Sequence, residues 1–200
     1  PRMGNGPVGI WCYEADSVKI QYCIAHDNKT AKGADDGGGF DFDGGVTNSV
    51  IQYCLSYKNQ GAAFGIFQYN GASPWHNNVI QNSISKNDGE VSAAHAGAYI
   101  WNSSEDDNQF KNLLFGNNII LSEKGAAIHY AVSQSKRKDF SFFNNIFVAR
   151  DEIITGDVSG DTFSGNNWWS FMSEFNVDGI KEFTTWAARS GKEHINGTIT

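Results

Sequence analysis

An internal repeat of about 30 residues constrains the fold of this chain more than any other feature. Five-residue segments of similar pattern start at residues 20, 51, 80, 115 and 142, so successive starts are 31, 29, 35 and 27 residues apart. They read IQYCI, IQYCL, IQNSI, FGNNI and FFNNI. Each alternates in polarity, and Asn, Asp or Gly follow it closely, which is typical of a strand and then a turn.

A second series of segments is offset from the first and shares its period. These segments begin with Gly and read GIWCY at 9–13, GFDFD at 39–43, GIFQY at 65–69 and GAYIW at 97–101, with a weaker copy AAIHY at 126–130. The segments of both series are short and lack the 3.6-residue periodicity of helices, which excludes helical solenoids. Two strand series with one period predict a parallel β-coil that advances by one layer per repeat.

In such a coil each residue lies about 4.8 Å from its counterpart in the next layer, so like residues stack on like. We therefore expect Ile20, Ile51 and Ile80 to form an inward aliphatic ladder. The asparagine pairs at 117–118 and 144–145 are expected to form amide ladders at a bend, because Asn tolerates left-handed backbone geometry.

The repeat fails near residue 170, so we expect a β-helix of five to six coils over 1–170 and a cap over 171–200. A helix is predicted near 179–190, with Asp178 as its N-cap and Gly191 as its terminator. Its apolar stripe would cover the last coil, whose open strand edges otherwise invite aggregation. We expect truncation at the N-terminus, because a strand-like segment follows Pro1 within ten residues and no cap precedes it.

Composition excludes several classes of protein. A net charge of −7 repels polyphosphate, so nucleic acid is not expected as a partner. No apolar stretch approaches the roughly 20 residues of a membrane-spanning helix. Three cysteines cannot all pair, and none shows zinc-site spacing, so buried free thiols are the simpler interpretation. A Cys23–Cys54 disulfide is the alternative, because the repeat places these two residues on adjacent coils.

Together the two series, with GFDFDGG at 39–45 and the asparagine-bounded segment 48–59, resemble the right-handed parallel β-helix proteins of the pectin-lyase-like superfamily. The resemblance covers roughly residues 9–169 and is nearest to bacterial secreted proteins associated with polysaccharide breakdown. It implies a right-handed β-helix, a secreted or periplasmic monomer and a polysaccharide or oligosaccharide partner. The superfamily also contains lyases, epimerases, tailspikes and adhesins, so the resemblance leaves the activity open.

The chain departs from two patterns of that superfamily. The acid and basic motifs of the polygalacturonases are missing, and the paired acid Asp35-Asp36 lacks its companions. Calcium-dependent pectate lyases place a basic residue beside acidic ligands, and no Arg or Lys lies next to the acids here. A lyase that needs Ca²⁺ is therefore the second enzymatic choice, and otherwise no metal or cofactor is expected.

Alternation along the Gly-led strands separates an outward set from an inward one. The inward set is apolar and comprises Ile10, Cys12, Phe40, Phe42, Ile66, Ala98 and Ile100. The outward set comprises Trp11, Tyr13, Asp41, Asp43, Phe67, Tyr69, Tyr99, Trp101, Ile128 and Tyr130. The opposite phase would bury two carboxylates at several kcal/mol each. Gln68 and His129 fit the inward set poorly.

The outward aromatic residues predict stacking against sugar rings. The predicted substrate-binding residues are Trp11, Tyr13, Phe67, Tyr69, Tyr99 and Trp101, with Trp75 in an overhanging loop and His26 and His95 as polar contacts. The alternative is that these rings form cross-strand ladders or pack beneath loops such as 71–77. In that case Trp75 caps a coil, and the two histidines are ordinary polar surface residues.

Asp41 and Asp43 lie two residues apart on one strand, so their Cβ atoms are about 6 to 7 Å apart on one face. Glycoside hydrolysis needs one carboxyl as proton donor and a second as nucleophile or base, and crowding raises one of the two pKa values. Glu14 and Asp36 are candidates for a further catalytic carboxylate. The alternative for the pair is a calcium site or a solvated acidic patch.

The sequence thus favours a glycoside hydrolase that acts on a polysaccharide. A non-catalytic carbohydrate-binding or adhesin module and a Ca²⁺-dependent lyase remain as alternatives.

Overall fold

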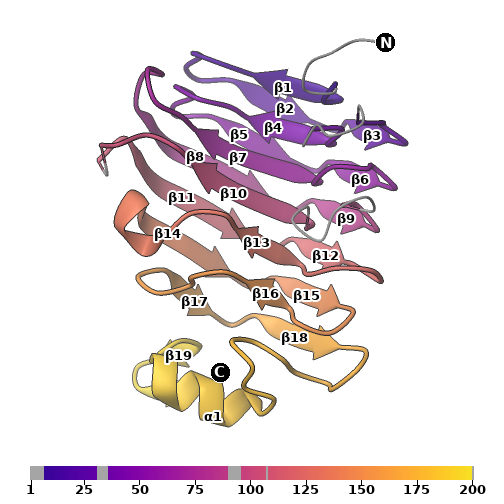
Figure 1. Cartoon of the computed structure of the whole chain (residues 1–200), viewed down its shortest axis with the longest axis vertical. Helices are drawn as coiled ribbons and strands as arrows, with labels where there is room; N and C mark the ends of the chain where they lie inside the picture. The colour runs from indigo at the N-terminus through magenta and orange to yellow at the C-terminus, as the bar shows by residue number, and fades with distance from the viewer. Residues whose placement is uncertain (1–6, 31–35, 90–95, 107, 200) are drawn as a thin grey trace.

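Three six-stranded parallel sheets coil around one core in the computed structural model, which describes residues 7–30, 36–89, 96–106 and 108–199 (Figure 1). Sheet A contains β1 (Ile10–Cys12), β4 (Phe40–Phe42), β7 (Phe64–Gln68), β10 (Ala98–Asn102), β13 (Ile128–Tyr130) and β16 (Ile154–Thr155). Sheet B contains β2 (Lys19–Gln21), β5 (Val50–Gln52), β8 (Trp75–Gln81), β11 (Phe110–Gly116), β14 (Lys138–Phe143) and β17 (Thr162–Ser164). Sheet C contains β3 (Ile24–His26), β6 (Leu55–Tyr57), β9 (Ile84–Lys86), β12 (Ile119–Leu121), β15 (Ile146–Ala149) and β18 (Asn167–Ser170).

Every third strand along the chain is a neighbour in the same sheet, so each coil adds one strand to each sheet. This arrangement confirms the predicted parallel β-helix. The remaining elements are the short 3-10 helix η1 (Gln134–Lys136), the helix α1 (Phe183–Ser190) and an antiparallel pair of β19 (His194–Ile195) with β20 (Thr198–Ile199). No helix in the described ranges has the length and apolar character needed to cross a membrane.

Sheet B supplies the predicted aliphatic ladder. Ile20 pairs in register with Ile51, and Ile51 with Ile80, and all three side chains are buried. Phenylalanines continue the ladder through the later coils at Phe115, Phe142 and Phe163. The core is therefore one continuous stack along the axis of the coil, in which each layer covers the one before it.

The bend between sheets B and C contains the predicted asparagine ladder. Asn118 donates its backbone N–H to Oδ1 of Asn145 at 2.9 Å, and Asn145 donates to Oδ1 of Asn166 at 2.9 Å. Glu193 ends the ladder by accepting the backbone N–H of Asn166 at 3.0 Å. Each buried amide thus satisfies the backbone of the coil before it.

The same bend corrects one expectation about the repeat. The residue before each ladder position has a positive φ, at Tyr22, Tyr53, Asn82, Asn117, Asn144 and Gly165. This left-handed residue turns the chain sharply, so each five-residue segment is two strands from different sheets and not a single strand. The turn reverses the inward and outward order: Ile24, which alternation from Ile20 would place inside, is 63% exposed, while Ala25 is buried.

The helix of the C-terminal cap begins later than predicted, at Phe183. Glu182 is the N-cap of α1, because its side chain accepts the backbone N–H groups of Thr184 at 2.9 Å and Thr185 at 2.6 Å. Asp178, the predicted N-cap, lies instead in a turn with φ of 53°. Gly191 ends the helix at φ of 68°, as predicted. The covering role is confirmed, because the buried Trp186 packs on Phe163 of the last coil.

All three cysteines are free, but only Cys54 is buried as the simpler interpretation expects, while Cys12 and Cys23 are half-buried. Cys23 and Cys54 nonetheless occupy equivalent positions on adjacent coils, directly after the left-handed residue of the bend.

Candidate functional site

The outer face of sheet A gathers most of the predicted site residues. Strand register places Trp11 beside Asp41, Asp41 beside Gly65, Gly65 beside Tyr99 and Tyr99 beside His129, in one outward column. A second column carries Phe67 beside Trp101. Outward aromatic and acidic side chains therefore meet over the first four coils, as the alternation predicted.

The fifth coil corrects the predicted outward set. Ile128 and Tyr130 are buried, with exposures of 0% and 3%, while His129 points outward and stacks on Tyr99 at 5.5 Å between ring centroids. The weaker copy at 126–130 was aligned one residue out of register, and a slip of one residue exchanges the two faces of a strand. The poor fit of His129 to the inward set was the sign of this error.

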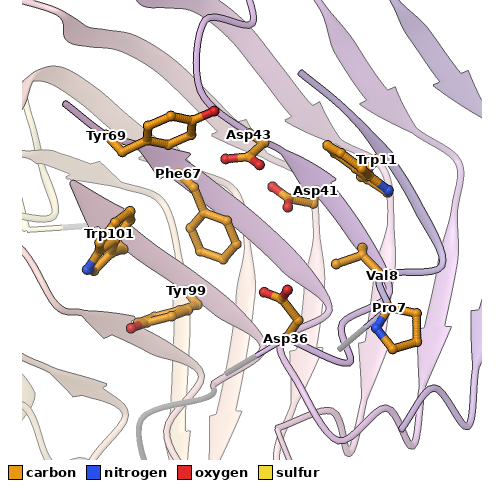
Figure 2. A pocket seen from close by; sticks show the side chains of 10 residues that line it. All are labelled: Pro7, Val8, Trp11, Asp36, Asp41, Asp43, Phe67, Tyr69, Tyr99 and Trp101. Carbon is orange, nitrogen blue, oxygen red and sulfur yellow. The ribbon is translucent and has the colours of Figure 1, made fainter. Parts of the chain in front are cut away.

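A pocket of about 530 Å³ opens on this face of sheet A. The residues that line it are Pro7, Val8, Trp11, Asp36, Asp41, Asp43, Phe67, Tyr69, Tyr99 and Trp101 (Figure 2). Eight of them were predicted from the sequence as catalytic or substrate-binding residues. In Figure 2 the carboxyl groups of Asp41 and Asp43 lie between the ring of Trp11 and the rings of Phe67 and Tyr69.

Gly65 creates the space in front of Asp41. A Cβ atom at this position would lie 2.7 Å from Cε2 of Phe67 and 3.0 Å from Oδ1 of Asp41. A side chain here would therefore displace the ring or the carboxyl group. Sequence reasoning missed this residue, as it missed Pro7 and Val8. The signal for Gly65 was a lone glycine at an outward position between an acid and an aromatic residue in the neighbouring coils.

Asp41 lies at the floor of the pocket and is almost completely buried, with an exposure of 4%. Its Oδ1 atom has no hydrogen-bond partner among the described residues. Burial raises the pKa of this carboxyl well above its usual value, and the nearby acids Asp43 and Asp36 raise it further. Burial therefore favours the protonated form of Asp41, and its Oδ1 atom has no partner among the described residues. Its burial differs from the exposed position that alternation alone predicts.

Asp43 has a different environment from Asp41, although both line the same pocket. It is half-buried and accepts the backbone N–H of Gly44 at 2.8 Å. Burial raises the pKa of Asp43, and the hydrogen bond from Gly44 opposes that rise. Two adjacent carboxyl groups whose environments separate their pKa values can act as an acid and a base in one reaction.

The aromatic walls of the pocket support one another through edge contacts. The ring of Phe67 meets Tyr99 at 5.4 Å and 77° and Trp101 at 6.5 Å and 85° between centroids. Such edge-to-face contacts fix the orientation of the rings that line the pocket. Trp11, on the opposite wall, has an exposure of 54%.

Two predicted site residues lie near the pocket without lining it. Tyr13 stacks on Tyr69 at 6.0 Å and extends the aromatic surface beyond the pocket. Glu14 accepts the backbone N–H of Ser73 at 2.7 Å and so connects the loop around 70–73 to the first coil. This contact gives Glu14 a structural role in positioning that loop.

Other predicted site residues lie elsewhere. Trp75 is fully buried at the start of β8, donates its indole N–H to the carbonyl of Phe42 at 3.1 Å and packs on Phe110, so its predicted role in substrate binding is wrong. His26 lies on sheet C, where its ring stacks on Tyr57 at 4.6 Å and its Nδ1 is 2.7 Å from a carboxylate oxygen of Asp27. It is separated from the pocket by the coil itself. His95 falls outside the described residues.

A calcium site was the alternative interpretation of Asp41 and Asp43. No group of three or more His, Cys, Asp or Glu side chains in the described part of the chain has a metal-binding arrangement. The described acids of the pocket are therefore not arranged as a set of metal ligands.

A family model described as "Right handed beta helix region" matches residues 3–115, more than half of the chain. The protein belongs to this right-handed β-helix family, and the family is compatible with carbohydrate-active proteins in a broad sense. Comparison with curated proteins found no match, and comparison with solved structures found none either.

Proposed function

We propose that the protein is a glycoside hydrolase that cleaves a polysaccharide in the pocket on sheet A. The observation that carries this proposal is the contrast between the two acids of the pocket. Asp41 is buried, its Oδ1 atom has no partner among the described residues, and its pKa is raised well above its usual value. Asp43 beside it is half-buried, and a hydrogen bond from a backbone amide opposes the rise of its pKa. Glycosidases use such a pair, in which one carboxyl donates a proton and the other remains ionised.

In the proposed reaction Asp41 donates its proton to the glycosidic oxygen as the bond from that oxygen to the anomeric carbon breaks. The positive charge that develops on the sugar ring is stabilised by the Asp43 carboxylate. Asp43 then either bonds to the anomeric carbon, and water that gives its proton to Asp41 later displaces Asp43 from that carbon, or Asp43 accepts a proton from the water that attacks the anomeric carbon. Inverting enzymes separate the two carboxyl groups by about 6.5 to 9.5 Å and retaining enzymes by about 5 to 5.5 Å.

Asp36 has a supporting role in this proposal. It lines the pocket, and its charge contributes to the raised pKa of Asp41. A third acid near the proton donor keeps that donor protonated to higher pH. The rings of Trp11, Tyr99 and Trp101 would hold the sugar units on either side of the cleaved bond.

The superfamily, the cellular location and the oligomeric state are part of the same proposal. We infer membership of the pectin-lyase-like superfamily, a secreted or periplasmic location and a monomeric state from the resemblance of the repeat. A polysaccharide outside the cell fits a pocket that opens on the side of a rigid coil, where a long chain can lie across the strands.

A non-catalytic carbohydrate-binding module is the second candidate, because the same aromatic walls serve binding alone. The specific observation in its favour is the 4% exposure of Asp41, which limits the access of a substrate to the proton donor. The two candidates differ in turnover, since a binding module retains the glycan unchanged after long incubation.

The test is a pair of isosteric substitutions, Asp41→Asn and Asp43→Asn, assayed on a panel of polysaccharides. Release of reducing sugar reports hydrolysis, and ultraviolet absorbance reports the unsaturated product of a lyase. Loss of general acid catalysis lowers turnover by about 100-fold or more, and we expect this for both variants. Asp27→Asn is the matched control, because it makes the same chemical change at an exposed residue that follows β3 of sheet C.

Circular dichroism should show all three variants folded like the parent protein. Full activity of either pocket variant would contradict the assignment. An ultraviolet signal that disappears on chelation of Ca²⁺ would replace the hydrolase with a lyase.

A further inference from the structure

The outer face of sheet C differs in polarity from the outer face of sheet B. On sheet B, Gln52 donates a hydrogen bond to Gln21 at 2.9 Å, and Gln81 donates to Gln52 at 2.9 Å, so a ladder of amides faces outward. On sheet C, the first residue of each of the first five strands points outward and is a branched aliphatic residue. These residues stack in register along one side of the molecule (Figure 1), and they are Ile24, Leu55, Ile84, Ile119 and Ile146.

The core of this chain does not account for that aliphatic column. The inward neighbours Ala25, Ser56 and Ser85 are small and buried, whereas Ile24 and Ile84 beside them are 63% and 43% exposed. A core alone favours the larger apolar side chain inside and the hydroxyl in water, because burial of an apolar side chain is favourable and burial of a hydroxyl gains little even when it is hydrogen-bonded. The aliphatic column therefore suits a contact outside the coil.

A second column of outward residues extends the apolar face. It lies two residues further along each strand and is apolar or aromatic in four of the six coils, at Tyr57, Leu121, Val148 and Trp169. His26 and Lys86 occupy the other two coils, and no Asp or Glu lies at an outward position of the six strands. The negative charge of the protein is therefore located away from this face.

The bend beside this face carries two tyrosines in a backbone conformation that is unfavourable for them. Tyr22 and Tyr53 have φ of 57° and 54°, at a position where the later coils have Asn or Gly. Bulky residues rarely adopt this left-handed region. The two rings stack at 5.3 Å between centroids and are 72% and 48% exposed. The turn gains nothing from a tyrosine, so these rings are further evidence for a contact on this side of the coil.

The exposed apolar area on this side is large enough for a stable interface. Taking about 200 Å² for a fully exposed large side chain, the exposed fractions of its members correspond to roughly 800 Å². The members are Tyr22, Ile24, Tyr53, Ile84, Ile119, Ile146, Trp169 and Phe171. The largest apolar patch of a typical monomer is about 300 to 600 Å², and each partner in a stable complex contributes about 800 Å².

We propose that the protein forms a two-fold symmetric dimer in which the outer faces of sheet C of two copies pack against each other. Both faces carry the same column with the same spacing of about 4.8 Å, so the side chains of one copy fit between those of the other. Each copy has a net charge of −7, and contact through a face without acidic strand residues keeps the repelling charges apart.

This inference goes beyond the proposed function and does not depend on it. The pocket opens on the outer face of sheet A, so packing through sheet C leaves both pockets of the dimer accessible. The resemblance of the repeat implies a monomer, and the apolar face of sheet C is the feature of this particular chain that argues against it.

The test is sedimentation velocity of the whole chain at about 1 to 100 µM, with one substitution in the proposed interface and a matched control. We expect the parent protein to sediment with twice the mass of one chain at about 10 µM and above. Ile119→Glu should raise the dimer dissociation constant by about 100-fold or more, because it buries an unpaired carboxylate from each copy in an apolar contact. The control is Leu114→Glu, which adds the same charge at a 46% exposed residue of the same coil on sheet B. It should leave the dissociation constant unchanged.

Two further measurements keep the proposal testable where one variant fails to fold, which circular dichroism would show. Ile84→Glu makes the same change one coil away in the same column and should dissociate the dimer to a similar extent. Salt distinguishes an apolar contact from an electrostatic one without any substitution. The dissociation constant of the parent protein should not rise between about 0.05 and 1 M NaCl, because screening weakens only charge interactions.

Each contrary outcome overturns the proposal. A parent protein that remains monomeric at about 100 µM rules out the dimer and leaves the face of sheet C to a different partner. A dimer that both Ile119→Glu and Ile84→Glu leave intact forms through another surface. Dissociation by Leu114→Glu to the same extent as by Ile119→Glu, or dissociation by salt, attributes the association to charge and not to the apolar face.

Discussion

Two buried carboxyl groups at opposite ends of the molecule have different surroundings. Asp161, near the C-terminal end, faces the fully buried Arg137, whose Nε lies 3.1 Å from both carboxylate oxygens. Lys192 donates to the backbone carbonyl of the same residue at 2.6 Å. Asp41, at the pocket end, has Asp43 and Asp36 as charged neighbours that raise its pKa. Asp161 is thus held by a cation and by hydrogen bonds, whereas Oδ1 of Asp41 has no hydrogen-bond partner among the described residues.

Aromatic residues show the same contrast between the two ends. At the C-terminal end Trp186 packs on Trp168 at 5.4 Å and on Phe175 at 5.6 Å, and its own exposure is 1%. At the pocket end Trp11 is 54% exposed. Residue type alone therefore does not reveal the role of a ring. Its role depends on whether it points into the coil and on whether the cap covers it.

The largest change is expected when Arg137 is replaced by Met. This substitution leaves Asp161 buried without its cation, and it also removes the donors to the backbone carbonyls of Val132, Asp157 and Ser159. Removing one partner of a buried ion pair costs about 3 to 5 kcal/mol, and we expect a loss of free energy of unfolding of about 5 kcal/mol. Urea denaturation followed by circular dichroism measures it. A loss below about 1 kcal/mol would show that the pair does not stabilise this end.

A slightly smaller loss is expected for Trp186→Ala in the cap. Truncation of a buried tryptophan costs about 3 to 5 kcal/mol through lost contacts and a residual cavity, and we expect about 4 kcal/mol. Glycan binding at a temperature where the variant remains folded should be unchanged, because the pocket lies on coils far from the cap (Figure 1). Loss of binding by the folded variant would contradict the separation of the two ends.

Replacing Asp41 with Asn should increase the free energy of unfolding, by less than the two losses expected for Arg137→Met and Trp186→Ala. The folded protein holds the proton of Asp41 to higher pH than the unfolded chain does, because burial raises the pKa of Asp41. The unfolded chain therefore gains more free energy from ionisation of Asp41 as the pH rises above about 4. The parent protein loses stability over the pH range from there to the raised pKa of Asp41 in the folded state. Asn does not ionise, so the variant gains stability relative to the parent as pH rises from 4 to 8.

Urea titrations at several pH values test this prediction, and Asp16→Asn is a control of opposite sign. Hydrogen bonds from Thr47 and Asn48 lower the pKa of Asp16 to about 2, so its substitution should remove stability that is present above pH 4. An advantage of Asp41→Asn that does not grow with pH would contradict the assignment of a buried proton donor.

The smallest effect on stability is expected for Trp101→Ala. The side chain is partly exposed on the outer face of sheet A, so its removal should change the free energy of unfolding by about 1 kcal/mol or less. Its edge contact with Phe67 is lost, but no buried cavity forms. Glycan binding should fall by about tenfold in the same variant. A large loss of stability with unchanged binding would make this ring structural, like Trp186.

The architecture was predictable because stacking repeats its chemistry from coil to coil. Ile51 could be recognised as a core residue from its counterparts at Ile20 and Ile80, and the amide ladder from Asn118 and Asn145. The third sheet was missed, because a single left-handed residue such as Tyr22 separates sheets B and C, and the outward residue after the bend, Ile24, is apolar like a core residue.

The candidate site was predictable in part for the same reason. Alternation identified the outward positions of Asp41 and Tyr99, but it contains no information about what lies above a strand. Asp41 shares a small cavity with Val8, Gly65 and Phe67, and alternation along its own strand does not reveal these neighbours. Trp75 was placed in a loop because Pro74 precedes it, although its register with Phe110 puts it inside the coil.

The tryptophans offer the most direct test of the central claim that glycans bind on the outer face of sheet A. The chain has six of them, and each indole N–H gives one signal in a proton–nitrogen correlation spectrum. Adding the glycan that binds most tightly in the panel of polysaccharides should shift the signals of Trp11 and Trp101. The buried Trp75 and Trp186 should stay in place, as should Trp169, which is 48% exposed on sheet C. A shift of the Trp169 signal with Trp11 and Trp101 unchanged would contradict the claim.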